Sequence, residues 1–223
     1  HMGAQYWGFE SKRHIATRIT DDGNGFDFDH DAHEYFDIGF KSPAVVSEFK
    51  VSTNTGINDM PSVASLTDGG FVVTWAGDDA TYDIFVQRYD ANGAAAGSEF
   101  QIGDNTAHDH NPSVTSLVDG GFVVTWIGDN NGSLGISGQR YDANGAAFGS
   151  EFQVSNGFGH HRSKVTSLDD GGFVVTWTGV TWNGVSNGYE DIFVQRYDAN
   201  GAEVGSEFQV HSSTSTHQYS PSV

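Results

Sequence analysis

The stretch Asp68-Gly-Gly-Phe-Val-Val-Thr-Trp75 decides the fold, because the chain contains it three times. The two further copies run from Asp119 to Trp126 and from Asp170 to Trp177, at a spacing of about 51 residues. Self-similarity at such a period is typical of a protein built from stacked structural repeats. The Asp-Gly-Gly part supplies the residues that a tight hairpin turn needs, and the apolar run after it reads as a buried strand.

Three other blocks recur at a similar spacing and complete the repeat. They are Gln87–Gly93, Gly97–Ile102 and Pro61–Val63, with copies at Gln139–Gly145 and Gln195–Gly201, at Gly149–Val154 and Gly205–Val210, and at Pro112–Val114 and Pro221–Val223. In the third unit the Pro-Ser-Val slot reads Ser163-Lys-Val165. Each unit therefore reads as four short strands, A to D, rich in β-branched and aromatic residues and bounded by Gly, Asn or Asp.

Two of the connections between these strands are constant and two vary. The A–B turn is Asp-Gly-Gly and the C–D turn is Asp-Ala-Asn-Gly, whereas the B–C and D–A connections differ between units. In an up-and-down sheet, alternate connections emerge on the same edge. We therefore expect the variable loops to gather on one edge and to form the binding surface, because binding residues are concentrated on loops held by a rigid scaffold.

The pattern predicts an all-β fold of about four four-stranded antiparallel units, and it favours a small β-propeller. We expect a degenerate first unit at 3–51 that carries an acidic segment, repeats at 52–102, 103–154 and 155–210, and a closing strand of the first unit at 211–223. Closure would remove the exposed sheet edges that invite aggregation. One alternative pairs the units into two β-sandwich domains of about 100 residues each, which the resemblance described below would make cadherin-like, and another is a truncated fragment of a longer array.

Composition narrows the class of partner. The 223 residues include 10 Lys and Arg against 29 Asp and Glu, a net charge of −19, and no cysteine. Such a chain is repelled by nucleic acid and by anionic membranes. No apolar stretch reaches the roughly 18 to 20 residues of a membrane span. The lack of cysteine excludes disulfides, thiolate zinc sites and cysteine catalysis.

The phrases Gly-Gly-Phe-Val-Val-Thr-Trp, Gln-Arg-Tyr-Asp-Ala-Asn-Gly and Gly-Ser-Glu-Phe-Gln-Val resemble the tandem repeats of large bacterial adhesins of the RTX type, over residues 47–223. In size, charge and repeat arithmetic, the whole chain resembles the rhizobial adhering proteins (the Rap family). Those are acidic, cysteine-free, secreted calcium-binding lectins with two so-called cadherin-like domains, and they recognise the bacterium's own acidic exopolysaccharide.

The resemblance implies a secreted bacterial protein, extracellular or at the cell surface, that binds acidic exopolysaccharide with calcium as its cofactor. We expect a monomeric lectin or adhesin without catalytic activity, since no catalytic motif is visible. Two alternatives remain open at this point. One is a structural spacer repeat of a larger adhesin, and the other is a polysaccharide-active enzyme.

Calcium prefers hard oxygen ligands, so aspartates packed closely together are the candidate metal ligands. Mutual repulsion would disfavour the run 21–31 unless a cation lies among its carboxylates. The variable B–C loops add further carboxylates and an amide. The candidates are Asp21, Asp22, Asn24, Asp27, Asp29, Asp31, Asp78, Asp79, Asp83, Asp129 and Asn130.

Aromatic and histidine side chains on the variable connections are the candidate sugar contacts, because aromatic rings can stack on the C–H faces of sugars. The candidates are Tyr82, His108, His110, His160, His161, Trp182 and Tyr189. The histidines could alternatively hold zinc or nickel, although pairs without a carboxylate partner are weak evidence for such a site.

Residues that repeat are expected to be structural. Trp75, Trp126 and Trp177 lie within strand B and are predicted to be core. The arginines of strand C are predicted to form a repeated ion pair, with glutamates of strand D as the expected partners. The pairs expected are Arg88 with Glu99, Arg140 with Glu151, and Arg196 with Glu207.

Overall fold

The structure, a computed structural model, describes residues 48–53, 56–78, 82–103, 109–130, 133–156, 161–181, 189–210, 217–218 and 220–222. The chain divides into two compact units, His1–Lys50 and Val51–Val223. All the described strands belong to the second unit. Among the described residues there is no helix with the length and apolar character needed to cross a membrane. The acidic run 21–31 lies outside the described residues.

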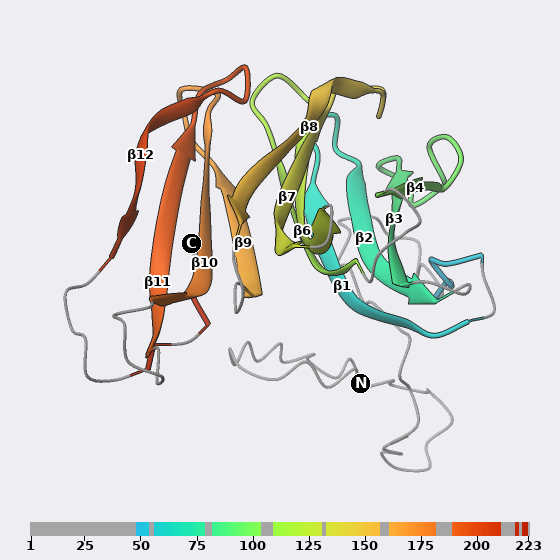
Figure 1. Cartoon of the computed structure of the whole chain (residues 1–223). Coiled ribbons are helices and arrows are strands. Elements are labelled where there is room, and N and C mark those ends of the chain that lie inside the picture. Colours follow the sequence, from blue (N-terminus) through green and yellow to red (C-terminus); the bar gives the residue numbers. More distant parts are fainter. Residues whose placement is uncertain are drawn as a thin grey trace, which may run out of the picture. The chain divides into compact units, whose positions relative to one another are not determined.

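The described residues form three four-stranded antiparallel sheets, in each of which the strand order follows the chain (Figure 1). The first sheet contains β1 (Asn58–Ser65), β2 (Phe71–Asp78), β3 (Tyr82–Tyr89) and β4 (Phe100–Ile102). The second contains β5 (His110–Ser116), β6 (Phe122–Asn130), β7 (Ser133–Tyr141) and β8 (Ala147–Asn156). The third contains β9 (His161–Ser167), β10 (Phe173–Thr181), β11 (Tyr189–Tyr197) and β12 (Glu203–Gln209). The predicted all-β fold and four-stranded repeat are confirmed.

The constant turns recur because each residue in them has a specific task. In the first A–B turn the Oδ1 atom of Asp68 accepts a hydrogen bond from the Gly70 amide at 2.8 Å. Gly69 has a φ of 86°, which favours glycine. A Cβ atom at Gly70 would lie 2.3 Å from the carbonyl oxygen of Tyr89. Only glycine therefore fits at both positions of the turn. The other two copies have the same geometry.

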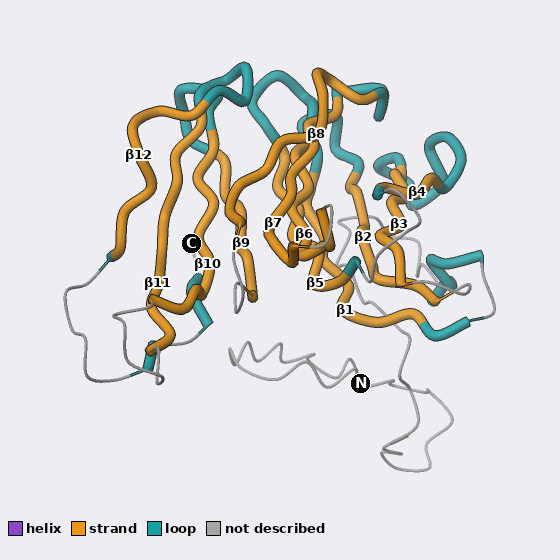
Figure 2. The backbone as a smooth tube through the Cα atoms, in the orientation of Figure 1, coloured by secondary structure: helices purple, strands orange, loops and turns teal. Residues whose placement is uncertain are grey.

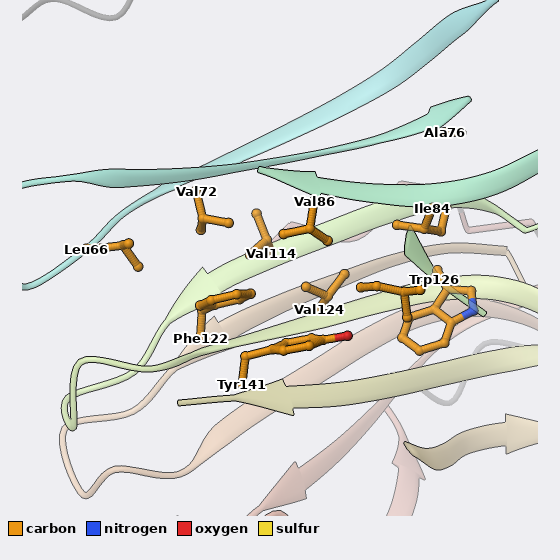
Figure 3. Close-up of a cluster of buried hydrophobic side chains, with 11 residues drawn as sticks. Leu66, Val72, Ala76, Ile84, Val86, Val114, Phe122, Val124, Trp126 and Tyr141 are labelled. Atoms are coloured by element: carbon orange, nitrogen blue, oxygen red, sulfur yellow. The ribbon is translucent and has the colours of Figure 1, made fainter. Parts of the chain in front are cut away.

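The three sheets stack through opposite faces of strand B. Val72 and Ala76 of β2 belong to one buried cluster with Phe122, Val124 and Trp126 of β6 (Figure 3). The next cluster joins the other face of β6 to β10 by the same scheme, with Val123, Ile127, Phe173, Val175 and Trp177. The predicted core role of the tryptophans is confirmed, because all three are at most 3% exposed.

The middle sheet is packed on both of its faces, which distinguishes this arrangement from two separate sandwiches. The first strands of successive sheets are also neighbours. The amide of Val114 in β5 donates to the Oγ atom of Ser62 in β1 at 3.2 Å, and Val165 in β9 repeats this bond to Ser113 at 3.3 Å. The described strands do not by themselves close a ring.

The repeated arginines form ion pairs within each sheet, but the partner predicted from the sequence is wrong. Arg88 Nη2 lies 3.5 Å from Asp68 Oδ2, and Arg140 Nη2 lies 2.7 Å from Asp119 Oδ2. Arg196 pairs with Asp170 in the same way. The reason is register, since the pairing of Phe71 with Tyr89 brings the A–B turn beside the end of strand C.

The glutamate expected to pair with Arg88 has another partner in the structure. The amide and Oγ1 atoms of Thr53 lie 3.1 and 3.2 Å from Glu99 Oε2. The arginine of the second sheet also reaches beyond its own unit, because Arg140 Nη1 donates to the carbonyl oxygen of Ala199 in the next C–D turn. These arginines therefore fasten each A–B turn to strand C and contribute to the contact between sheets.

Buried threonines at one position of strand B differ in their hydrogen bonds. Thr74 and Thr125 are both fully buried. Thr125 Oγ1 lies 3.3 Å from Ser163 Oγ in the next unit. Thr74 Oγ1 has no hydrogen-bond partner within the described residues, and the residue equivalent to Ser163 in the next unit is Pro112, which has no hydroxyl.

This difference predicts opposite effects of one substitution. Thr74→Val should raise the free energy of unfolding by about 1 kcal/mol, because an isosteric apolar group replaces a buried hydroxyl without a partner. Thr125→Val should lower it by about 1 kcal/mol, because Ser163 then loses its partner. Chemical denaturation of both variants measures the two changes, and shifts of the same sign would contradict the assignment.

Candidate functional site

The sheets have two edges of different character. The A–B and C–D turns of successive units contact one another along what we call the turn edge; Figure 2 shows these turns for the second and third sheets. A Cβ atom at Gly120 would lie 3.2 Å from Thr67 Oγ1, and one at Gly145 would lie 3.2 Å from Arg88 Cδ. The turn edge is therefore occupied by contacts between units. The opposite edge, which we call the loop edge, carries the B–C and D–A connections.

Successive units meet at the loop edge through a repeated backbone bond. The amide of Asp109, just before β5, donates to the carbonyl oxygen of Tyr82 at the start of β3, at 2.7 Å. The amide of Gln218 makes the equivalent bond to Glu190 in β11, also at 2.7 Å. We call these places the first and the last junction. The first junction brings the start of β3 beside the residues that lead into β5, and the last brings the start of β11 beside Gln218.

Both junctions contain buried carboxylates. The exposed fraction is 1% for Asp83, 4% for Asp109 and 0% for Asp191. The carboxylate of Asp109 lies against glycine backbone, because a Cβ atom at Gly103 would be 2.1 Å from its Oδ2 and one at Gly128 would be 2.2 Å from its Oδ1. Burying a carboxylate requires polar partners or a cation. These three residues are therefore the buried carboxylates of the two junctions, and each needs polar contacts or a cation beside it.

Of these three carboxylates, the sequence analysis named only Asp83. Asp191 occupies the same position in the third unit, in a second Asp-Ile-Phe, so the repetition was a signal that could have indicated it. Asp109 lies in a connection whose sequence varies. Its burial depends on the approach of Gly103 and Gly128, which the sequence around Asp109 does not show.

Half-buried aromatic and histidine side chains border the same junctions. Tyr82 and His110 lie at the first junction and Tyr189 lies at the last, as the sequence predicted for the loop edge. The ring of Tyr189 contacts the ring of His217 edge-on, with centroids 5.3 Å apart. The Glu190 amide donates to His217 Nδ1 at 3.3 Å. The structure thus brings together residues from the third B–C and the last D–A connections.

The remaining predicted residues fall into two groups. For the first group the structure gives the strand that each residue belongs to. Each lies at or next to the end of its strand on the loop edge: Asp78, Asp129, Asn130 and His161. The others lie outside the described residues: Asp21, Asp22, Asn24, Asp27, Asp29, Asp31, Asp79, His108, His160 and Trp182. Within the described ranges, no three His, Cys, Asp or Glu side chains come together in a group that could hold a metal ion.

These features define an all-β repeat protein with a structural turn edge and a loop edge that combines carboxylates, tyrosines and histidines. Comparison with models of known protein families finds no match. Comparison with curated proteins finds no relative either.

The turn edge predicts a pH dependence of stability. Hydrogen bonds from backbone amides, that of Ala94 first, lower the pKa of Asp90, and the same cause lowers the pKa of Asp142 and Asp198. A carboxyl whose pKa is lower in the folded state than its ordinary 3.8 stabilises the fold above that value. This contribution is lost as the pH falls through the folded pKa.

We therefore expect the variant with Asp90→Asn, Asp142→Asn and Asp198→Asn to have a lower Tm than the parent chain at pH 7. Its neutral amide oxygen accepts weaker hydrogen bonds than a carboxylate does. The gap in Tm should close as the pH falls below about 3.8. Thermal melts from pH 7 to pH 2 test this, and a gap that stays constant would rule out the carboxylates as its source.

Proposed function

We propose that the chain is a secreted bacterial lectin or adhesin that uses calcium to bind acidic exopolysaccharide through its loop edge. The observation that carries this proposal is the separation of the two edges. The turn edge is committed to contacts between units, whereas the loop edge varies from unit to unit and carries half-buried tyrosines beside buried carboxylates. Such an edge has the composition of a binding surface and lacks a recognisable catalytic arrangement among the described residues, so we propose binding without catalysis.

Calcium is proposed because of the charge. A chain with a net charge of −19 repels a polyanion at long range, so affinity needs a bridging cation. Asp83 and Asp109 are candidate ligands at the first junction, where the bond from the Asp109 amide to Tyr82 joins their strands. Sugar hydroxyl and carboxylate oxygens would complete a coordination shell of six to eight oxygens. Tyr82, which is half-buried at the same junction, is the candidate sugar contact there.

The test is titration calorimetry with polygalacturonate as the acidic polymer at 150 mM salt. Binding should be strong with calcium and should fall by at least about tenfold in excess chelator, because the bridge is removed. The double variant Asp83→Asn with Asp109→Asn should lose the part of the affinity that depends on calcium. The matched control Asp90→Asn, which changes a carboxylate of the turn edge, should retain it.

Three results would contradict this proposal. Full affinity in excess chelator would remove calcium from the mechanism. A rise in Tm with calcium but no binding to any acidic polymer would favour a structural spacer of a larger adhesin. New reducing ends after incubation with the polymer would instead identify a polysaccharide-active enzyme.

We also propose that the three sheets are consecutive blades of a small β-propeller that a fourth unit completes within a monomer. The start of that unit is supported by backbone geometry. Ser220 has a φ of 56°, which matches the values of 51°, 54° and 57° at Met60, Asn111 and Arg162, the residues at the same position of the other units. The bond from Gln218 to Glu190 likewise repeats the one from Asp109 to Tyr82.

Ring closure predicts the effect of one phenylalanine. Phe100 packs on the next unit, with its ring centroid 5.3 Å from that of Tyr141, whereas the equivalent Phe208 is 58% exposed. A closing fourth unit would cover Phe208. Phe208→Ala should then lower the free energy of unfolding by about 3 kcal/mol, as expected for Phe100→Ala. Denaturation of both variants, with light scattering to confirm a monomer, measures this, and no loss for Phe208→Ala would indicate an open array.

A further inference from the structure

Positive charge is scarce in the repeat region and most of it has a structural task. Residues 51–223 contain five Lys and Arg against twenty Asp and Glu. Arg88, Arg140 and Arg196 pair with the aspartates of the A–B turns. The other two cations, Arg162 and Lys164, lie two residues apart on β9, the first strand of the third sheet. Neither forms an ion pair with a described residue, so their charge is available to a ligand.

These two cations occur where the third unit departs from the repeat. The residues equivalent to Arg162 are Met60 and Asn111, and the residues equivalent to Lys164 are Ser62 and Ser113. A register shift at this place puts Arg162 in the left-handed region, with a φ of 57°. Asn is enriched there, and a long side chain such as Arg is uncommon. The same register shift and positive φ occur at Met60 and Asn111, so this backbone belongs to the repeat, and among the three described sheets the third alone places a cation on it.

The exposure pattern along β9 shows which way the two cations face. Ser163 and Val165 are buried against the second sheet, while Arg162 and Lys164 are exposed. Arg162 Nη1 donates to Ser220 Oγ at 2.7 Å. The start of the next strand A is therefore already beside β9, and the two cations stay exposed with it in place.

The electrostatic surroundings permit an anion to approach. Towards β11, the register pairs His161 with Thr178 and Thr178 with Ile192, so Glu190 and Asp191 lie two strands away. Two strand spacings amount to about 10 Å. This equals the screening length of about 10 Å at 0.1 M salt. An anion that contacts Arg162 and Lys164 directly therefore feels these cations more strongly than the acidic surface beyond them.

We propose that Arg162, Lys164 and the hydroxyl of Ser220 form a binding site for a carboxylate of the acidic polysaccharide. The guanidinium has five N–H donors, of which one is used by Ser220, so a pair remains for a bidentate contact. The Ser220 hydroxyl accepts from Arg162 and keeps its own proton to donate. The identity of the polymer rests on the proposed function, but this contact needs no calcium.

The test uses the double variant Arg162→Asn with Lys164→Ser, which gives the third unit the residues that the second unit has at these two positions. Because Asn111 and Ser113 already occupy these positions in β5, the variant should fold with an unchanged or higher Tm. The probe is polygalacturonate at 100 mM salt, the ionic strength at which the acidic surface beyond the site is screened, with its fully methyl-esterified form as the neutral control. The control variant is Arg196→Gln, which removes a cation from the turn edge instead.

In excess chelator, the parent chain and Arg196→Gln should bind polygalacturonate weakly and should not bind the ester. The double variant should bind at least about tenfold more weakly, since two charge-assisted contacts are lost. With calcium, it should keep the calcium-dependent gain in affinity. Equal binding by parent and double variant in both conditions would overturn the carboxylate site and leave the calcium proposal standing.

A second readout keeps the two proposals separate if the polymer does not bind even with calcium. Titration with monomeric galacturonate, followed by NMR, should shift the side-chain Nε–H signal of Arg162 and leave that of Arg196 unchanged. If the Arg162 signal does not move, the site is absent whatever the result with the polymer.

Discussion

Each sheet of this protein is apolar on both faces, and the rest of the structure depends on that constraint. A four-stranded sheet cannot cover its own faces, so it is stable only when neighbours cover them. Val124 and Trp126 point one way from β6 and Val123 and Ile127 point the other, and all four are at most 2% exposed. At about 1.5 to 3 kcal/mol for each fully buried apolar side chain, stacking is a dominant favourable term. One repeat of the sequence therefore forms one sheet, but a single sheet would not be stable without its neighbours.

Stacking also explains why some positions are constant and others vary. A residue that contacts the neighbouring units has the same surroundings in each repeat, so its identity is constrained. The A–B turns, the C–D turns and the arginine of strand C are such positions. Arg140 shows both roles, because it pairs with Asp119 in its own unit and donates to Ala199 in the next. At the loop edge the repeated contact is a bond between backbone atoms, so the side chains there can differ between units in carboxylates, tyrosines and histidines.

The third unit shows how one local departure can have two consequences. Where the other units have Pro-Ser, it has Ser163-Lys164. The serine hydroxyl lies beside Thr125 Oγ1, a buried group that would face a proline if the repeat were exact. The lysine adds a second cation beside Arg162 on an acidic protein. In a repeat protein such departures are informative, because the equivalent positions in the same chain show the structural default.

The strands, the constant turns and the core tryptophans could all be predicted from the amino-acid sequence. Each of these follows from local rules: period-2 alternation, the positive φ of Gly69, and aspartates that cap their own turns. The sequence also separated the two edges, because strand direction alternates along the chain. Which side chains meet across units could not be predicted in this way, because it depends on how the sheets pack. The register of β2 with β3 brings Asp68, and not Glu99, to Arg88, and close backbone approach buries Asp109. The contact between Arg162 and Ser220 spans 58 residues and joins β9 to a segment that follows the last described strand. Such pairings depend on packing in three dimensions, which local sequence rules do not describe.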